Sequence, residues 1–186
     1  MRENTSEIDI SIVTPVYNEG PNLETLHAEL VAAMEAYGKS FEIVAVDDGS
    51  KDNSFEILRK LHEKDPRVRV IRLARNFGQN PAIYAAFSMV RGNVIVTIDA
   101  DLQNPPSEIP KLVDALGDGY DIVQGWREQR RDSLPRKLAS RTVNRAVSSL
   151  TKVDIKDLGS GMKAYRREVI ERLCLSTHHS RYLPAE

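Results

Sequence analysis

The sequence predicts an α/β protein with a mainly parallel, Rossmann-like sheet flanked by helices. Short apolar segments alternate along the chain with segments whose apolar residues recur at helical spacing. Residues 94–98 are all β-branched, which suits a strand buried on both faces by helices. A length of 186 residues is sufficient to bury such a sheet. With no repeat or linker in the sequence, we expect one domain over residues 1–186.

The first strand and helix are predicted from the start of the chain. Residues 8–13 (IDISIV) are typical of a strand, and residues 15–20 form a loop rich in turn-forming residues. Pro21 suits the first turn of a helix that Gly38 would end. The buried face of this helix is predicted to carry four apolar residues at helical spacing, Leu23, Leu26, Leu30 and Met34.

The next strand and helix follow the same order. Residues 41–46 (FEIVAV) predict a second strand, which ends on the carboxylates of Asp47 and Asp48. Apolar residues at helical spacing predict a helix over residues 53–64. Residues 68–73 (VRVIRL) alternate in polarity and predict a third strand.

The second half of the predicted sheet follows. A helix is expected from Asn80 to Val90, and residues 94–98 form the fourth strand. After Pro105 and Pro106 a helix is expected to about Leu116, and residues 121–125 predict a fifth strand. Strands that alternate with helices require crossover connections, so the sheet should be mainly parallel.

Composition excludes several classes of protein. The charged fraction is 28% and the hydrophobic fraction 41%, as in ordinary globular proteins, and the net charge of −1 gives no sign of a nucleic-acid partner. The single cysteine, Cys174, rules out an intramolecular disulfide and favours a reducing compartment. No apolar run approaches the roughly 20 residues of a membrane helix, so we expect this chain itself to be soluble.

Two carboxylates follow the most buried strand. Asp99 and Asp101 lie two residues apart, so they can project to the same side at the carboxyl end of the strand, where open α/β sheets bind ligands. Carboxylates this close repel each other, which favours a hard divalent cation between them, and Gln103 can add a neutral oxygen. The alternative is that these acidic residues only mark a polar loop.

A phosphate-containing ligand would need such a cation. The chain lacks a GxGxxG sequence after its first strand, and it has no GxxxxGK[ST] motif. A metal ion held by carboxylates would take the place of a glycine-rich loop.

Four motifs together resemble the family 2 glycosyltransferases of the GT-A fold, and most closely their polyprenyl-phosphate branch. These are residues 14–19 (TPVYNE), 46–50 (VDDGS), 76–79 (NFGQ) and 99–106 (DADLQNPP), and matches run from about Ile10 to Pro184. The branch includes dolichol-phosphate mannosyltransferase and bacterial undecaprenyl-phosphate glycosyltransferases. Its members usually continue into membrane helices, so we expect this chain to be a truncated catalytic domain.

The resemblance implies a donor pocket and a metal site. Pro15, Tyr17, Glu19 and Asp48 would bind the nucleotide, although Asp48 could instead be a turn carboxylate. Asp99 and Asp101, with Gln103 as a possible third ligand, would hold Mg²⁺ or Mn²⁺, with Asp99 divided between the metal and the donor ribose.

A basic segment supplies the expected acceptor site. Between residues 126 and 145 there are seven lysines or arginines and two acidic residues, a net charge of +5. Residues 135–150 have the pattern of an amphipathic helix. By resemblance, Arg127, Arg136 and Ser140 would bind the phosphate of a polyprenyl phosphate. The alternatives are a solvated basic face or general attraction to anionic lipids.

The resemblance also implies the reaction. A nucleotide-diphosphate sugar, with UDP favoured, would donate to a polyprenyl phosphate such as undecaprenyl phosphate, with inversion, at the cytoplasmic face of the membrane. The expected catalytic residues are Asp101, Arg127, Arg136 and Asp157. Two alternatives remain at this point: a soluble family 2 enzyme with a hydroxyl acceptor, and a non-catalytic nucleotide-binding module.

Overall fold

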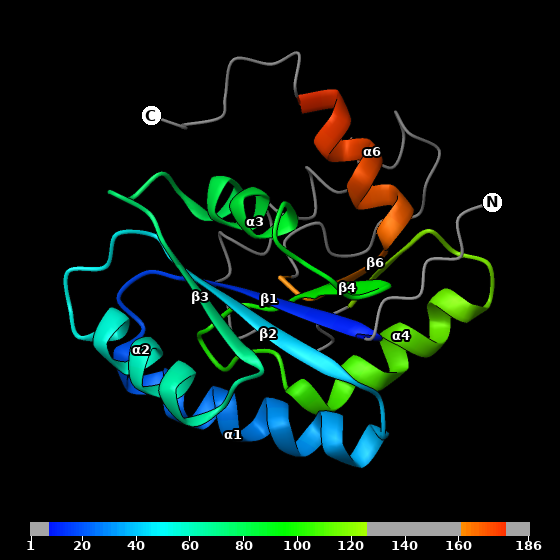
Figure 1. Cartoon of the computed structure of the whole chain (residues 1–186). Helices are drawn as coiled ribbons and strands as arrows, with labels where there is room; N and C mark the ends of the chain where they lie inside the picture. Colours follow the sequence, from blue (N-terminus) through cyan, green and yellow to red (C-terminus); the bar gives the residue numbers. More distant parts are fainter. Residues whose placement is uncertain (1–7, 126–160, 178–186) are drawn as a thin grey trace, which may run out of the picture.

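The described part of the chain forms a six-stranded sheet between two layers of helices (Figure 1). The computed structural model describes residues 8–125 and 161–177. The strand order is β3-β2-β1-β4-β6-β5. The strands are β1 (Ile10–Val16), β2 (Phe41–Asp47), β3 (Val68–Arg72), β4 (Val94–Thr97), β5 (Ile122–Gln124) and β6 (Lys163–Arg166).

The sheet is mostly parallel, as the sequence predicts. β1 pairs in parallel with both β2 and β4, and β2 pairs in parallel with β3. β6 lies between β4 and β5 and runs antiparallel to both. The fifth predicted strand is therefore present, but a strand from much later in the chain separates it from β4.

The predicted boundaries shift by a few residues. β1 continues to Val16, where Pro15 is opposite Val46 and Val16 is opposite Asp47, so two residues expected in a loop belong to a strand. The N–H of Asp48 donates to the carbonyl oxygen of Val16 at 2.8 Å and extends this pairing by one bond. Tyr17, the next residue, therefore lies at the carboxyl edge of the sheet.

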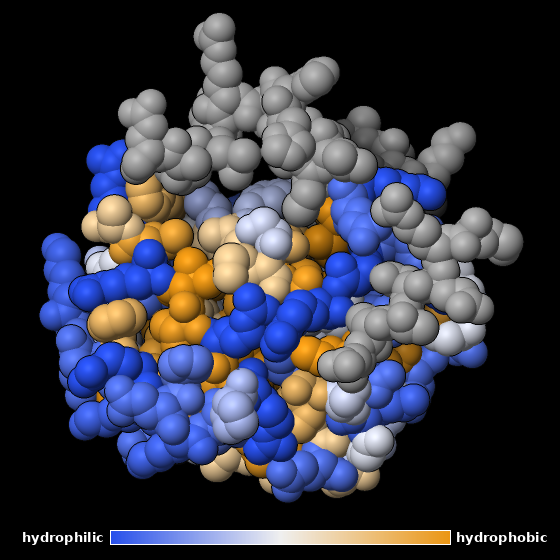
Figure 2. All heavy atoms as spheres, viewed as in Figure 1, coloured by the Kyte–Doolittle hydropathy of each residue, from blue (hydrophilic) through white to orange (hydrophobic). Residues whose placement is uncertain are grey.

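Two layers of helices cover the sheet (Figure 1). One layer contains α1 (Gly20–Tyr37), α2 (Ser54–Lys64), the short 3-10 helix η1 (Pro106–Glu108) and α4 (Ile109–Gly117); the other contains α3 (Gln79–Phe87) and α6 (Arg167–Thr177). Each layer has its own apolar core cluster against the sheet. The outer surface over α1 and α2 is mostly hydrophilic (Figure 2). None of the helices within the described ranges is long and apolar enough to cross a bilayer.

The predicted buried face of α1 is confirmed. Its four predicted apolar residues are buried, and Gly38 adopts a left-handed φ of 73° at the C-terminus of the helix. The N–H of Gly38 donates to the carbonyl oxygens of Met34 and Glu35. A residue with a Cβ adopts this φ only at an energetic cost, so glycine fits the position.

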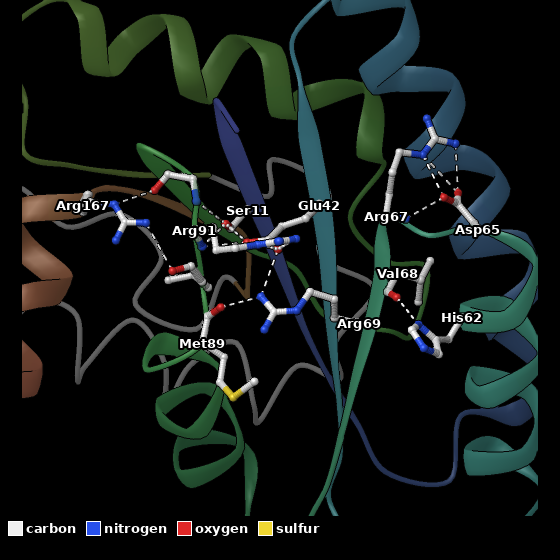
Figure 3. A network of polar contacts seen from close by, with 12 residues as sticks. Ser11, Glu42, His62, Asp65, Arg67, Val68, Arg69, Met89, Arg91 and Arg167 are labelled. Atoms are coloured by element: carbon white, nitrogen blue, oxygen red, sulfur yellow. Dashed lines mark hydrogen bonds and ion pairs between the residues drawn. The ribbon is translucent and has the colours of Figure 1, made fainter. Parts of the chain in front are cut away.

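A buried polar network joins the amino ends of the parallel strands (Figure 3). Glu42 is fully buried and accepts hydrogen bonds from the Ser11 hydroxyl at 2.7 Å, the Arg91 N–H at 2.7 Å and the Arg69 guanidinium at 3.1 Å. Burial alone would raise the pKa of Glu42, but these hydrogen bonds outweigh it and hold the pKa below its usual value. The network lies at the edge of the sheet opposite the carboxyl ends of the strands.

Candidate functional site

A cavity of about 350 Å³ lies at the carboxyl ends of β1, β2 and β4. Open α/β sheets bind ligands at this edge, between helices that cover opposite faces. Four chain segments line it, and they contribute Pro15, Val16, Tyr17 and Glu19; Asp48; Asn76, Gly78 and Gln79; and Asp99, Ala100 and Asp101. Four of these side chains are carboxylates.

The two carboxylates in the loop after β4, Asp99 and Asp101, accept hydrogen bonds from different groups. Asp99 Oδ1 accepts a hydrogen bond from the Gln79 side-chain amide at 2.6 Å, and the Asp99 carboxylate lies directly against the backbone of Gly161. Asp101 Oδ1 accepts the N–H of Gln103 at 3.1 Å, across Leu102, which has a left-handed φ of 59°. A non-glycine residue in this region is uncommon, and such strain is often found at functional sites.

The two carboxylates after β2 have separate roles. Asp47 is fully buried, accepts the N–H of Ser50 at 3.1 Å and lies 3.5 Å from the Arg72 Nε, so it stabilises the turn. Asp48 lines the cavity. Both of its oxygens accept backbone hydrogen bonds at 2.8 Å, one from Phe77 and one from Gly78.

The loop after β1 is fixed against the loop after β2. The N–H of Asn18, at a φ of 57°, donates to the Ser50 hydroxyl at 3.0 Å, and the N–H of Lys51 donates to Asn18 Oδ1 at 2.8 Å. The N–H of Glu19 donates to the Ser54 hydroxyl at 3.0 Å. Tyr17, between these bonds and β1, is 40% exposed and lines the cavity.

The chemistry of the lining suits a hard cation. Glu19, Asp48, Asp99 and Asp101 bring negative charge together, and the described part of the lining contains no lysine or arginine. Within residues 8–125 and 161–177, no three His, Cys, Asp or Glu side chains lie close enough together to hold a metal ion by themselves. Mg²⁺ sites commonly use one or two carboxylates and take their other ligands from water and substrate phosphates, so the residues fit such an ion.

The structure brings most of the predicted site residues together. The cavity is lined by all six predicted donor-binding residues, Pro15, Tyr17, Glu19, Asp48, Asp99 and Asp101. Gln103 is exposed and lies outside this lining, and its backbone rather than its side chain contacts Asp101. Its role as a third metal ligand stays a prediction. The four remaining predicted residues, Arg127, Arg136, Ser140 and Asp157, lie outside the described residues.

Sequence reasoning missed the contribution of residues 76–79, which precede and begin α3. Asn76, Gly78 and Gln79 line the cavity, yet the sequence assigned them no role. The available signal was the NFGQ motif itself, which combines a glycine suited to a positive φ with polar residues at a helix start. Gly78 has a φ of 99°.

Comparison with known proteins identifies the family. The model of the family described as Glycosyl transferase family 2 matches residues 11–174. Two proteins named undecaprenyl-phosphate 4-deoxy-4-formamido-L-arabinose transferase each match over 176 residues, or 94% of this chain. The one from Pseudomonas paraeruginosa is 46% identical, with 52% of its length covered. The one from Edwardsiella ictaluri is 44% identical, with 54% covered. The chain thus spans about half the length of these relatives.

Solved structures of glycosyltransferases share the fold. Glucosyl-3-phosphoglycerate synthase from Mycobacterium tuberculosis, in complex with Mn²⁺, UDP and phosphoglyceric acid, matches with a TM-score of 0.69 at 22% identity, over 89% of this chain and 58% of that one. A mannosyltransferase from Pyrobaculum calidifontis, in complex with GDP-Man and Mn²⁺, matches with a TM-score of 0.64 at 20% identity, over 91% of this chain and 48% of that one. The fold, the ordered motifs and the family match agree: this chain has the GT-A fold and belongs to glycosyl transferase family 2.

Proposed function

We propose that this chain is the donor-binding and catalytic part of a metal-dependent, inverting glycosyltransferase. It would transfer a sugar from a nucleotide diphosphate, with UDP favoured, to a polyprenyl phosphate such as undecaprenyl phosphate. The observation that carries the proposal is the convergence of carboxylates from three strand ends on one cavity. The names of the relatives, which the chain matches over half of their length, support this acceptor.

The nucleotide would occupy the β1–β2 side of the cavity. Pro15 and the exposed face of Tyr17 offer flat apolar surfaces for a ribose or a base. Asp48 has a fixed carboxylate, and each oxygen that accepts one backbone N–H retains a second lone pair for a base N–H. Orientation of the nucleotide would therefore need little rearrangement of the pocket.

The diphosphate would lie on the β4 side. Asp99 and Asp101 would hold Mg²⁺ or Mn²⁺ there, and Mn²⁺ is present with GDP-Man or UDP in the two solved structures. The ion, when bound, supplies positive charge that stabilises the diphosphate leaving group. Asp101 is the main ligand in this proposal, because Asp99 also accepts the Gln79 amide.

The acceptor needs no strong general base. A phosphate monoester has a second pKa near 6, so at pH 7 its oxygen is already a nucleophile. This oxygen would attack the anomeric carbon in line as the bond to the diphosphate oxygen breaks and the nucleoside diphosphate leaves. Arg127, Arg136 and Ser140, which lie outside the described residues, are proposed to bind the lipid phosphate, and Asp157 is proposed to act near the reacting centre. In this proposal the reaction takes place at the cytoplasmic face of the membrane.

Acceptor choice distinguishes this proposal from its rival. The protein is incubated with a panel of UDP-sugars and either undecaprenyl phosphate or saccharide acceptors, and lipid-linked and free products are separated. We expect turnover on the lipid phosphate. Turnover on a saccharide with none on the lipid phosphate would favour a family 2 enzyme with a hydroxyl acceptor.

The metal assignment predicts a metal-dependent affinity for UDP. Titration calorimetry with UDP should show binding that strengthens with Mn²⁺, and Asp101→Ala should weaken the Mn²⁺-dependent binding by at least roughly tenfold, because one charged ligand is lost. Asp118→Ala, at the exposed end of α4, is the matched control and should bind like the wild type. UDP binding that is equally strong with and without Mn²⁺, and that is unchanged in Asp101→Ala, would contradict the assignment of Asp101 as a metal ligand.

A further inference from the structure

We propose that the segment of residues 76–79, which precedes and begins α3, is a positioning element that fixes two donor-site carboxylates at once. Gln79 is its positioning residue for Asp99. The inference rests on the proposed function, because it assigns to the segment the geometry of the donor site.

The first contact is made by the backbone of the segment. The N–H groups of Phe77 and Gly78 each donate to one oxygen of Asp48, both at 2.8 Å. Asp48 is 3% exposed and lines the cavity. Two donors on two oxygens fix both the position and the plane of the carboxylate.

The second contact is made by a side chain. The Gln79 amide donates to Asp99 Oδ1 at 2.6 Å. On the other side, the Asp99 carboxylate lies so close to Gly161 that a Cβ there would overlap it. The amide and the glycine backbone therefore hold the carboxylate from two directions.

These two carboxylates belong to strands that are not neighbours. Asp48 follows β2 and Asp99 follows β4, and β1 lies between those strands. One four-residue segment therefore spans the central strand and sets the spacing between the nucleotide side and the metal side of the cavity. A displacement of about 1 Å at such a site is sufficient to reduce catalysis strongly.

The segment is itself held in place. Gly49 has a φ of 67°, and a Cβ on it would lie 2.5 Å from the backbone carbon of Arg75, so glycine allows the chain to pass this close to the turn after β2. The Arg75 guanidinium lies over the Phe77 ring, 4.9 Å from its centre. The segment leads directly into α3, whose Ala82, Ala86 and Phe87 are buried against the sheet.

Substitution of Gln79 tests the inference. Gln79→Met keeps the length of the side chain but removes the donor, and Gln79→Glu places a second carboxylate against Asp99. We expect UDP affinity in the presence of Mn²⁺ to fall roughly tenfold in Gln79→Met, the loss of one charge-assisted hydrogen bond, and further in Gln79→Glu. The measurements are calorimetric titration of UDP and the fraction of Mn²⁺ bound in the presence of UDP by electron paramagnetic resonance.

The control and a stability measurement isolate the positioning role. Asn80→Ala changes the next, exposed residue of α3 outside the cavity lining and should bind as the wild type does. Because Gln79 is exposed, the melting temperature of both Gln79 variants should stay close to the wild-type value.

Kinetics give a second readout. The KM for the donor should rise in Gln79→Met more than kcat falls, because the Asp99 contact is expected in both the ground state and the transition state. A wild-type protein that does not bind UDP with Mn²⁺ would overturn the proposed function. Wild-type binding that both Gln79 variants retain in full, or a loss of stability without a loss of affinity, would overturn the positioning role alone.

Discussion

At the scale of single residues, the proposed donor site depends on how each carboxylate is held. Asp47 and Asp48 are adjacent in sequence, yet one stabilises a turn through Ser50 and the other lines the cavity. Strand alternation explains the difference, because neighbouring side chains point to opposite faces. A predicted carboxylate pair at a strand end can therefore contain one structural and one functional member.

Gly161 provides a test at this scale. In Gly161→Ala, the new Cβ would overlap the Asp99 carboxylate, so either the carboxylate or the backbone before β6 must move. We expect at least a roughly tenfold loss of UDP affinity in the presence of Mn²⁺, because Asp99 leaves the position set by Gln79. Calorimetric titration measures the affinity, and circular dichroism checks that the fold is kept.

Gly117→Ala is the matched control for that substitution. A Cβ on Gly117 would meet no atom within 4 Å, and the residue ends α4 away from the cavity lining. It should bind UDP as the wild type does. Equal affinity in both alanine variants would show that the close approach of Gly161 to Asp99 is unimportant for the donor.

Sequence reasoning predicted the residues of the site better than their contacts. Pro15, Tyr17 and Glu19 line the cavity, and their role in nucleotide binding stays a prediction. The Gln79–Asp99 hydrogen bond joins a helix start to a strand end 20 residues later, and local patterns carry no information on such a pair. Gly161 could not be predicted either, because its contact depends on the pairing of β6 with β4.

At the scale of elements, Asp65 joins two helices to a strand. Asp65 follows the last residue of α2. Its carboxylate accepts a hydrogen bond of 2.9 Å from the guanidinium of Arg67, which directly precedes β3. The same carboxylate lies 3.0 Å from the Nε2 of His27 on α1. The hydrogen bond from Arg67 lowers the pKa of Asp65 to about 2. The charged carboxylate therefore stabilises the contact between these elements.

The lowered pKa of Asp65 predicts a pH dependence of stability. The charged Asp65 carboxylate contributes to the free energy of unfolding above the unfolded-state pKa of about 3.9, and this contribution is lost as the pH falls toward about 2. Asp65→Asn should lower the free energy of unfolding by about 2 kcal/mol at pH 7, and this difference should shrink between pH 4 and pH 2. Urea denaturation across this range measures both.

Glu63→Gln is the control for this pH dependence. Glu63 is exposed and forms a 3.7 Å ion pair with Arg59, so its loss should change the free energy of unfolding by less than about 0.5 kcal/mol. A difference between Asp65→Asn and the wild type that stays constant down to pH 2 would contradict the assigned role of the Asp65 charge.

The alternation of strands and helices was predictable, but the position of β6 was not. Each predicted strand from residue 8 to residue 125 is present, with ends displaced by a few residues, because period and turn residues are local properties. The four residues of β6 (KAYR) have no strong strand pattern, and long-range pairing places them between β4 and β5. This insertion makes the sheet mixed rather than entirely parallel.

At the scale of the whole molecule, the candidate site and the buried Glu42 network lie at opposite edges of the sheet. The cavity lies at the carboxyl ends of the parallel strands, and the Glu42 network lies at their amino ends. The sequence did not reveal the network, because Glu42 lies in an apolar strand and its partners Ser11, Arg69 and Arg91 come from distant segments. The network therefore joins the sheet without a direct contact to the cavity.

This separation predicts a stability change without a change in affinity. Glu42→Gln should lower the free energy of unfolding by about 2–4 kcal/mol, because it leaves Arg69 and Arg91 without their buried carboxylate. UDP affinity in the presence of Mn²⁺ should stay within about twofold of the wild type at a temperature where the variant is folded. Urea denaturation and calorimetric titration measure the two quantities.

The same substitution also has an outcome that would refute the prediction. A folded Glu42→Gln variant with wild-type stability would show that the network contributes little. A folded variant that loses its UDP affinity would show that the two edges of the sheet are coupled.

The late position of β6 in the chain has a consequence during synthesis. A growing polypeptide emerges from the ribosome from its amino end, so β1 to β4 and the Asp99 loop leave first and can pair with one another. Gly161, which confines Asp99, leaves only after more than sixty further residues. The parallel strands can thus pair before Gly161 is present to confine the Asp99 carboxylate at the proposed donor site, and Met162 and Ala164 join the apolar core only afterwards.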